Sequence, residues 1–298
     1  MIVSVSRRTD IPWFYADWFF HRVRQGVALV PNPMNGRQIR RVALSPDAVD
    51  GFVFWSKNPA PMLERLAEIA AYPYYFQFTL TPYGPDIEPG VPGKGEIVDT
   101  FRRLSDRIGP HRVIWRYDPV LIGAGYTAAR HVDGFARYAA RLCGHTEKAT
   151  ISFLDLYAKI ARRMEAMGIR PPSEAEKEML AEGFSRAAAQ NGLALFTCAE
   201  QADLSRHGIG RAQCVDADLL ARISGKALRA KKDENQRPAC GCAQSVDIGA
   251  YHCCPAGCAY CYANESGARV AASRARHDPL SPFLIGGAAP DEAAAGKR

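Results

Sequence analysis

Six apolar segments, most of them followed by a helical stretch, constrain the fold of this chain more than any other feature. They are typical of buried strands and cover residues 1–8, 51–59, 74–82, 111–120, 148–157 and 193–200. Apolar residues at helical spacing occupy 13–26, 61–72, 95–109, 128–144, 158–168 and 173–192. Such a series favours a mostly parallel sheet with helices packed outside it. We therefore predict an α/β fold, a partial or complete parallel β/α barrel similar to a TIM barrel, with short extra strands at 27–32 and 40–46.

The regular alternation stops at about residue 200. A short helical pattern remains in 216–230, a charged stretch follows, and then most of the cysteines appear. The last residues are small and polar, as is typical of flexible ends. We predict three parts: a β/α barrel over 1–200, a cysteine-rich cluster-binding cap over 201–275 and a flexible tail over 276–298.

Length, composition and charge narrow the class of protein. The 298 residues are long enough for one barrel-sized domain. The chain holds no apolar run near the roughly 18 residues of a membrane-spanning helix, and its start does not resemble a secretory signal. Nine cysteines without an export signal favour metal binding in a reducing, cytoplasmic compartment over disulfides. The net charge of +7 fits an anionic substrate or nucleic acid, and solubility alone would also explain it.

Polar and reactive side chains stand at the end of each predicted strand. In a parallel β/α sheet or barrel these ends share one face, and that face hosts the active site. Polar residues at the end of one strand do not by themselves indicate a site, because the loop that follows a strand is usually polar. Polar residues at the ends of all six strands predict an active-site face. The candidates for catalysis are Arg7, Asp10, Lys57, Arg116 and Asp118, and the candidates for cofactor binding include Asn58 and Glu200. For Arg116 and Asp118 the alternative is a buried structural ion pair.

Four cysteines lie within nine residues near the C-terminus, in the stretch "CCPAGCAYC" over 253–261. Cys254, Cys258 and Cys261 have a spacing that lets one loop supply three thiolates to an iron–sulfur cluster. Three ligands would leave one iron of a [4Fe-4S] cluster open, as catalytic metal sites are. The alternative is a closed zinc site, with Cys253 or His252 as the fourth ligand.

Four other cysteines could form a second metal site. Cys198 ends a predicted strand, Cys214 follows it, and Cys240 and Cys242 form a "CGC" pair. Soft thiolate ligands suit an auxiliary cluster or a zinc ion, although the separations are irregular. Cys143 lies among apolar residues of a predicted helix, where we expect it to serve packing.

The motif C-x-x-x-C-x-Y-C resembles the cluster motif of radical S-adenosylmethionine enzymes. The chain as a whole, from Ile2 to about Asn264, resembles the bacterial family known as domain of unknown function 1848. This likeness rests on "SRRTDIPWFY", "VDGFVFWSKNPAPML", "FQFTLTPYG", "VIWRYDP" and "CGCAQSVDIGAYHCCPAGCAYCYAN". Unlike the usual radical enzyme, which has its motif after the first strand, this chain has it after the last.

The resemblance to radical enzymes implies a fold, a cofactor pair and a reaction. The fold would be a partial barrel of about six units, with Cys254, Cys258 and Cys261 as ligands of the [4Fe-4S] cluster and Tyr260 near the adenine of S-adenosylmethionine. An electron, supplied by a flavodoxin or ferredoxin, would break a carbon–sulfur bond of that cofactor. The resulting 5′-deoxyadenosyl radical would attack an unidentified substrate, either a small molecule or a nucleic acid.

Two other functions stay open. The chain could be a nucleic-acid-binding or repair factor with a structural iron–sulfur or zinc site, whose phosphate contacts would come from Arg7, Arg8, Arg40, Arg41, Lys231 and Lys232. It could also be a zinc-bound or metal-free β/α barrel enzyme that uses Asp10, Arg116, Asp118 and Glu200 for acid/base work or anion binding.

Overall fold

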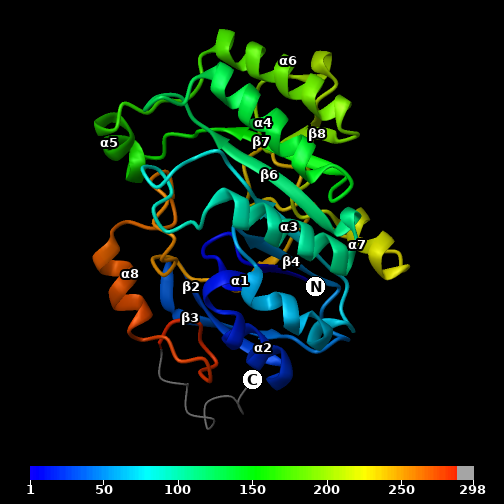
Figure 1. Cartoon of the computed structure of the whole chain (residues 1–298). Coiled ribbons are helices and arrows are strands. Elements are labelled where there is room, and N and C mark those ends of the chain that lie inside the picture. The colour runs from blue at the N-terminus through cyan, green and yellow to red at the C-terminus, as the bar shows by residue number, and fades with distance from the viewer. Residues whose placement is uncertain (287–298) are drawn as a thin grey trace.

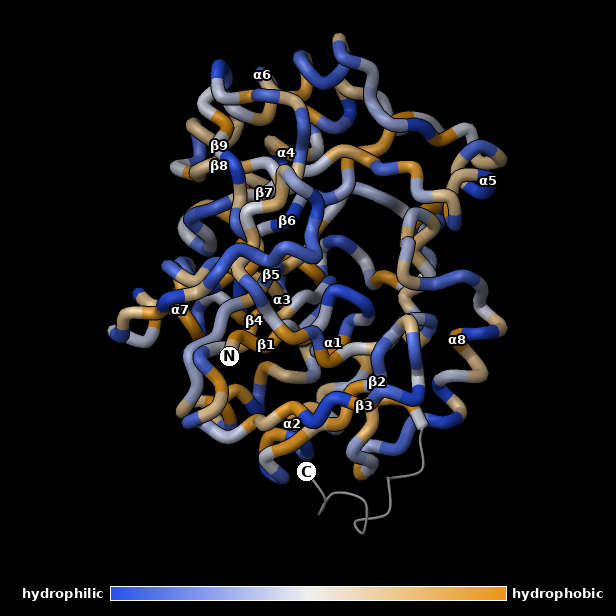
Figure 2. Tube along the Cα trace, turned by 180° about the vertical axis from the view of Figure 1, so that it is seen from behind, coloured by the Kyte–Doolittle hydropathy of each residue, from blue (hydrophilic) through white to orange (hydrophobic). Residues whose placement is uncertain are grey.

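The computed structural model describes residues 1–286 and contains an eight-stranded sheet in the order β10-β1-β4-β5-β6-β7-β8-β9. All neighbouring strands in this sheet are parallel. The strands are β1 (Ile2–Val5), β4 (Gly51–Ser56), β5 (Tyr74–Thr79), β6 (Val113–Val120), β7 (Lys148–Phe153), β8 (Ala194–Thr197), β9 (Gly210–Arg211) and β10 (Val246–Asp247). The six predicted strands are all present, and Figure 2 shows them side by side in the order of the sequence.

The sheet is open. In the part of the chain that the structure describes, β9 and β10 stand at opposite ends of the strand order and do not pair with each other. Each is two residues long, so neither offers the ladder of backbone hydrogen bonds that barrel closure requires. The predicted parallel α/β fold is thus confirmed, whereas a complete TIM-type barrel is not formed.

Helices follow the strands as the sequence predicts. They are α1 (Ile11–Phe14), α2 (Ala16–Gln25), η1 (Ala60–Ile69), α3 (Lys94–Ile108), η2 (Pro110–Arg112), α4 (Ala128–Leu142), α5 (Ala158–Ala166), α6 (Glu174–Gln190), η3 (Ser205–His207), α7 (Ala217–Ser224) and α8 (Gly267–Arg274). Their ends carry ordinary signals: Ser173 and Glu176 form a capping box at α6, and Gly26 ends α2 with a φ of 72°. The helix expected over 61–72 is a 3-10 helix, η1. Within residues 1–286, no helix is both long and apolar enough to cross a membrane.

The two faces of the sheet pack against different parts of the chain. Successive side chains of a strand point to opposite faces. Phe54 and Phe76 belong to the large core shared with α2, α3, α4 and α6, and Figure 1 shows α3 and α4 in front of the sheet. Val53 and Tyr75 pack on the other side, against α7 and Cys214. The segment after β8 therefore covers the face that the helices leave free, and it brings cysteines onto that face.

A separate β hairpin near the N-terminus packs against the segment that follows α8. The expected short strands near the first unit form an antiparallel hairpin, β2 (Val27–Asn32) and β3 (Asn35–Ala43). The chain after α8 lies along this hairpin, where Leu29 bridges Phe283, and both figures show α8 beside it. Packed structure thus continues past residue 275 to residue 286, and 287–298 of the expected tail lie outside the described residues. Because β9 and β10 pair with the large sheet, the expected cap over 201–275 is joined to it by backbone hydrogen bonds.

Candidate active site

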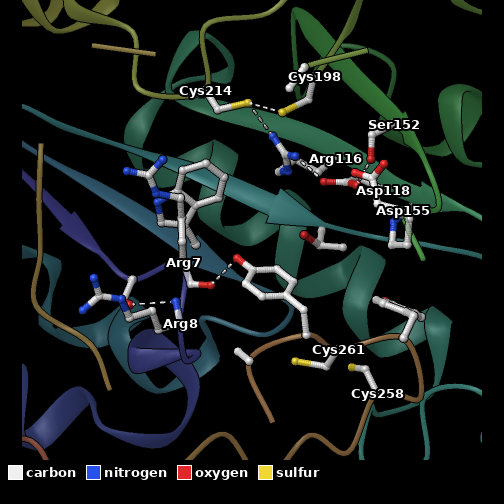
Figure 3. Close-up of a pocket in the computed structure, with 18 of the residues that line it drawn as sticks. Arg7, Arg8, Arg116, Asp118, Ser152, Asp155, Cys198, Cys214, Cys258 and Cys261 are labelled. Carbon is white, nitrogen blue, oxygen red and sulfur yellow. Dashed lines mark hydrogen bonds and ion pairs between the residues drawn. The ribbon is translucent and has the colours of Figure 1, made fainter. Parts of the chain in front are cut away.

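A cavity of about 680 Å³ lies at the carboxyl ends of the parallel strands. Its wall combines the ends of β1, β4, β6 and β7 with the loop over 254–261. Among the candidates it is lined by Arg7, Asp10, Lys57, Arg116, Asp118, Tyr260, Cys198, Cys214, Cys240, Cys242, Cys254, Cys258 and Cys261. Figure 3 shows Arg116 and Asp118 near one group of cysteines, represented by Cys198 and Cys214, with Cys258 and Cys261 across the cavity.

The end of β1 is held by Asp247, a residue of β10 that sequence reasoning missed. Its carboxylate accepts hydrogen bonds from Ser6 Oγ at 2.5 Å, from the backbone N of Arg7 at 2.8 Å and from that of Gly249 at 2.9 Å. Arg7 then directs its guanidinium along the cavity wall, 3.1 Å from Ser245 Oγ. The sequence signal for Asp247 was only the short apolar "VDI" before the cysteine motif.

Asp10 joins the ends of two strands and carries a shifted pKa. One carboxylate oxygen accepts from the backbone N of Trp13 at 3.1 Å and so caps α1, and the other accepts from the backbone N of Lys57 at 2.7 Å. Burial raises the pKa of Asp10 to about 6, against the opposing effect of these hydrogen bonds. A carboxyl group in the wall that titrates near neutral pH is suited to acid/base chemistry.

Glu88 is the most enclosed charged side chain near the cavity, and sequence reasoning missed it. It is 0% exposed. Its carboxylate lies 2.8 Å from Nζ of Lys57 and 2.5 Å from Nζ of Lys94, and it accepts hydrogen bonds from the hydroxyls of Thr81 and Tyr260. Burial opposes ionisation, but the charges of Lys57 and Lys94 outweigh it and lower the pKa of Glu88 to about 2. Glu88 stands two residues after Asp86 in "GPDIEPG", and acidic residues in such a turn-forming stretch give no sequence signal of this kind.

Arg116 and Asp118 form an ion pair in the wall at the end of β6. Ser152 donates a second hydrogen bond to Asp118. Burial would raise the pKa of Asp118, but the charge of Arg116 and the hydrogen bond from Ser152 lower it. The guanidinium also lies 2.9 Å from Sγ of Cys214 and stacks over Trp55. The pair is therefore largely buried and also borders the cavity, because Asp118 keeps 22% of its side chain exposed.

The other two candidates at strand ends do not line the cavity. Asn58 is buried, and its Oδ1 accepts from the backbone N of Ala60 at the start of η1. Glu200 accepts from the backbone N of Phe153 at 2.8 Å, and burial raises its pKa to about 7. Both side chains are used to hold their own loops, a role that asparagine and acidic residues commonly take where a chain turns.

The loop with the cysteine motif rests on the segment over 87–90. The backbone N of Gly90 donates to the carbonyl of Ala256 at 3.1 Å, and that of Ala259 donates to the carbonyl of Ile87 at 2.8 Å. A Cβ on Gly90 would meet the oxygen of Ala256 at 2.7 Å, so only glycine permits this approach. Gly257, with a φ of 71°, lets the loop turn between these two backbone contacts.

Three cysteines of this loop present to the cavity the type of ligand that iron–sulfur clusters use. Cys254, Cys258 and Cys261 all face the cavity, and burial raises the pKa of the Cys258 thiol to about 12. Within residues 1–286, no three His, Cys, Asp or Glu side chains surround a common point that would hold a single metal ion. In a [4Fe-4S] cluster each thiolate bonds a different iron, so the three sulfurs need not share such a point.

The two residues considered as a fourth ligand are directed elsewhere. Cys253 is 0% exposed, belongs to the large core, and donates from Sγ to the carbonyl of Ala250 at 3.1 Å. Nδ1 of His252 accepts from the backbone N of Glu265 at 3.1 Å. The loop therefore offers three thiols to the cavity.

The second group of cysteines is also brought together. Sγ of Cys214 lies 3.1 Å from Sγ of Cys198, and Cys242 and Cys240 follow beside Cys214. The hydrogen bond from Cys242 lowers the pKa of the Cys240 thiol to about 7. Cys143, expected to serve packing, is instead exposed, because it stands at the C-cap of α4 rather than on its buried face.

The basic residues considered for phosphate contacts are divided between two environments. Arg7 and Arg8 are half-buried in the cavity wall. The others are exposed, on β3 and in the segment before β10: Arg40, Arg41, Lys231 and Lys232. These four exposed residues do not line the cavity with Arg7 and Arg8.

The chain matches the model of a family described as "Domain of unknown function (DUF1848)" over residues 2–263. Since this range covers most of the sequence and both groups of cysteines, the chain belongs to that family. No curated protein and no solved structure matches it.

Proposed function

We propose that this member of the DUF1848 family is an iron–sulfur enzyme that binds a [4Fe-4S] cluster through Cys254, Cys258 and Cys261. We further propose that it cleaves S-adenosylmethionine reductively to start a radical reaction. One observation carries the proposal: the three cysteines of one loop line the same cavity as Lys57, Arg116 and Asp118, although they follow the last long strand in the sequence.

The number of thiols supports an open iron. A four-iron cluster held by three thiolates keeps one iron for a further ligand. Cys253 lies in the core and His252 is hydrogen-bonded to Glu265, so neither is directed at the cavity. A closed four-ligand zinc site is therefore the less favoured use of this loop.

The strand order supports a likeness to a partial barrel. From β1 through β4 to β8 each new strand is added on the same side of the preceding one, and all are parallel. Right-handed crossovers then place the helices between these strands on one face, as in a barrel whose inner face is left for the site. The segment after β8 would take the place of the missing strands.

The chain's own residues have the chemistry that such a reaction needs. When bound, the cluster would supply the electron that breaks a carbon–sulfur bond of S-adenosylmethionine. Arg116 and Lys57 could bind a carboxylate, and Asp118 could accept from ribose hydroxyls. Asp10, with a pKa of about 6, could hold or release a proton at neutral pH. The segment after β8 would keep water from the reacting atoms, and a flavodoxin or ferredoxin would deliver the electron.

The test is a comparison of metal content under anaerobic conditions. Wild-type protein should hold about four irons and four sulfides more than the triple variant Cys254→Ala, Cys258→Ala, Cys261→Ala. The variant Cys143→Ser, which changes an exposed thiol, should keep the wild-type iron content. Equal iron in wild type and triple variant would contradict the cluster assignment, and one zinc lost in the triple variant would favour a zinc-bound enzyme.

The open iron has its own test. S-adenosylmethionine should change the electron paramagnetic resonance spectrum of the reduced cluster, and dithionite should then release methionine and 5′-deoxyadenosine slowly even without substrate. A cluster whose spectrum does not respond to S-adenosylmethionine would leave an iron–sulfur protein but end the radical assignment.

A further inference from the structure

Four thiols from three separate segments meet on the side of the cavity opposite the loop over 254–261. Cys198 follows β8, Cys214 follows β9, and Cys240 and Cys242 precede β10. All four line the cavity. The shortest sulfur–sulfur distance, 3.1 Å, joins Cys198 and Cys214. Segments that are far apart in the sequence thus bring four thiols to one wall of the cavity, two of them in direct contact.

We propose that Cys198 and Cys214 form a redox-active dithiol in the cavity wall, which a low-molecular-weight disulfide oxidises to an internal disulfide bond. An S–S bond is about 2 Å long, so the two sulfurs need to approach each other by only about 1 Å. This chemistry does not depend on the cluster proposed above, and it gives the cavity a store of two electrons.

The two thiols differ in access, and this difference assigns their roles. Cys198 is half-buried and lines the cavity, so an external disulfide can reach its sulfur. Cys214 also lines the cavity but is only 1% exposed, so a bulky external disulfide reaches it less readily. Cys198 therefore forms the mixed disulfide, and Cys214 resolves it.

The exchange balances in two steps. The sulfur of Cys198 attacks the external disulfide, whose S–S bond breaks, and one half leaves as a thiol. The sulfur of Cys214 then attacks the mixed disulfide at Cys198, and the second half leaves as a thiol. The protein loses two S–H bonds and gains one S–S bond, and two electrons and two protons leave with the two released thiols.

Arg116 connects this pair to the rest of the site. Its Nη1 lies 2.9 Å from Sγ of Cys214, where a positive charge stabilises the negative charge that develops on sulfur during exchange. Its Nη2 is paired with Asp118. Oxidation removes the thiol partner of Arg116, so the state of the dithiol affects the ion pair that borders the cavity.

Two of the four thiols are in direct contact, and the four do not surround a point that would hold a single metal ion. Throughout residues 1–286, no three His, Cys, Asp or Glu side chains share a point suited to one metal ion. Direct sulfur–sulfur contact, as between Cys198 and Cys214, is instead the geometry from which a disulfide forms.

Mass spectrometry can test the pair directly, because trypsin separates the two cysteines. Cys198 falls in the tryptic peptide 187–206 and Cys214 in 212–222, and each peptide contains no other cysteine. Full-length protein of measured iron and zinc content is treated anaerobically with oxidised glutathione, its free thiols are alkylated, and it is digested. We expect the linked pair 187–206/212–222, and its loss after treatment with dithiothreitol.

Two variants make the result specific. Cys198→Ser should abolish the linked pair, whereas Cys143→Ser, with its cysteine in peptide 142–148, should leave its yield unchanged. The proposal is overturned if oxidation leaves Cys198 and Cys214 alkylated as free thiols, or links Cys214 to the peptide with Cys240 and Cys242 instead. It is also overturned if the protein holds one equivalent of zinc or iron that both Cys198→Ser and Cys214→Ser lose. The tryptic peptide with Cys240 and Cys242, 233–269, also carries Cys254, Cys258 and Cys261, so their iron is tested separately, by the triple variant described above.

Discussion

Lys57 and Glu88 form an ion pair, with Nζ of Lys57 2.8 Å from a carboxylate oxygen of Glu88, at the point where the loop over 254–261 meets the sheet. The carboxylate also holds Lys94 and the hydroxyl of Tyr260, and it is fully buried. One acidic side chain thus ties the end of β4, the start of α3 and the cysteine loop together. This arrangement makes the loop's position sensitive to the charge of Glu88.

Replacing Glu88 by glutamine should lower the free energy of unfolding by about 3 kcal/mol at neutral pH, because Lys57 and Lys94 would keep their buried charges without a counter-ion. Chemical denaturation followed by circular dichroism measures this. The matched variant Glu64→Gln removes an exposed partner of Arg107 and should have little effect. The folded-state pKa of Glu88, about 2, lies below its unfolded value, so its contribution is present above pH 4.5 and is lost as the pH falls toward 2. A Glu88→Gln variant as stable as wild type at pH 7 would contradict the network.

Gly90→Ala should displace the loop over 254–261. The added Cβ would meet the carbonyl oxygen of Ala256 at 2.7 Å, and its three nearest neighbours are all backbone atoms of Ala256, which leave little room to adjust. We expect a lower iron content after anaerobic reconstitution, measured against protein concentration. Gly95→Ala is the control, since nothing lies within 4 Å of its Cβ and alanine favours the helix. Equal iron in both variants would show that the loop tolerates the displacement.

Cys253→Ala should keep the iron of the cluster, whereas Cys258→Ala should lose it. The sulfur of Cys253 lies in the large core and is hydrogen-bonded to the carbonyl of Ala250, while Cys258 lines the cavity. The cost of Cys253→Ala should be limited to packing, less than about 2 kcal/mol of unfolding free energy. Iron analysis and visible absorption of the two variants measure the difference. If Cys253→Ala also loses its iron, the loop supplies four ligands and the open iron is excluded.

His131 should make the fold less stable in mild acid. Its Nδ1 accepts from the hydroxyl of Tyr117 at 2.9 Å and its Nε2 donates to the carbonyl of Leu121 at 2.7 Å, an arrangement that suits the neutral ring. Burial lowers its pKa to about 4, below the unfolded value of about 6.5. The unfolded chain therefore binds the proton first as pH falls, and about 3 kcal/mol should be lost between pH 6.5 and 4.

The measurement for His131 is the pH dependence of unfolding by urea, compared with that of His131→Gln. The variant lacks the titrating ring, so its stability should fall less over this range, whatever its stability at pH 7. Parallel curves for the two proteins would contradict the assignment of this pH dependence to His131.

Much of the architecture could be predicted from local pattern. The strands β4 and β5 are largely apolar because both faces of a parallel sheet are covered, and α6 carries its capping box in the sequence itself. The strand-end candidates Arg7, Lys57, Arg116 and Asp118 could be named because parallel strands put their carboxyl ends on one face. Local pattern could not show whether the sheet closes into a barrel, because closure depends on whether the strands at its two ends, β9 and β10, pair with each other.

The sequence by itself determined the parallel α/β class, the face on which polar strand ends gather, and the three-cysteine spacing of the C-terminal loop, because each depends on residues close together in the chain. Only the tertiary structure decided that the sheet stays open, that Glu88 and Asp247 hold the loops of the site, and that Cys198 meets Cys214. It also decided that Asn58 and Glu200 serve their own turns and that Cys143 faces solvent. These outcomes depend on contacts between segments up to about 240 residues apart, and such contacts form only where packing and charge in the whole fold favour them.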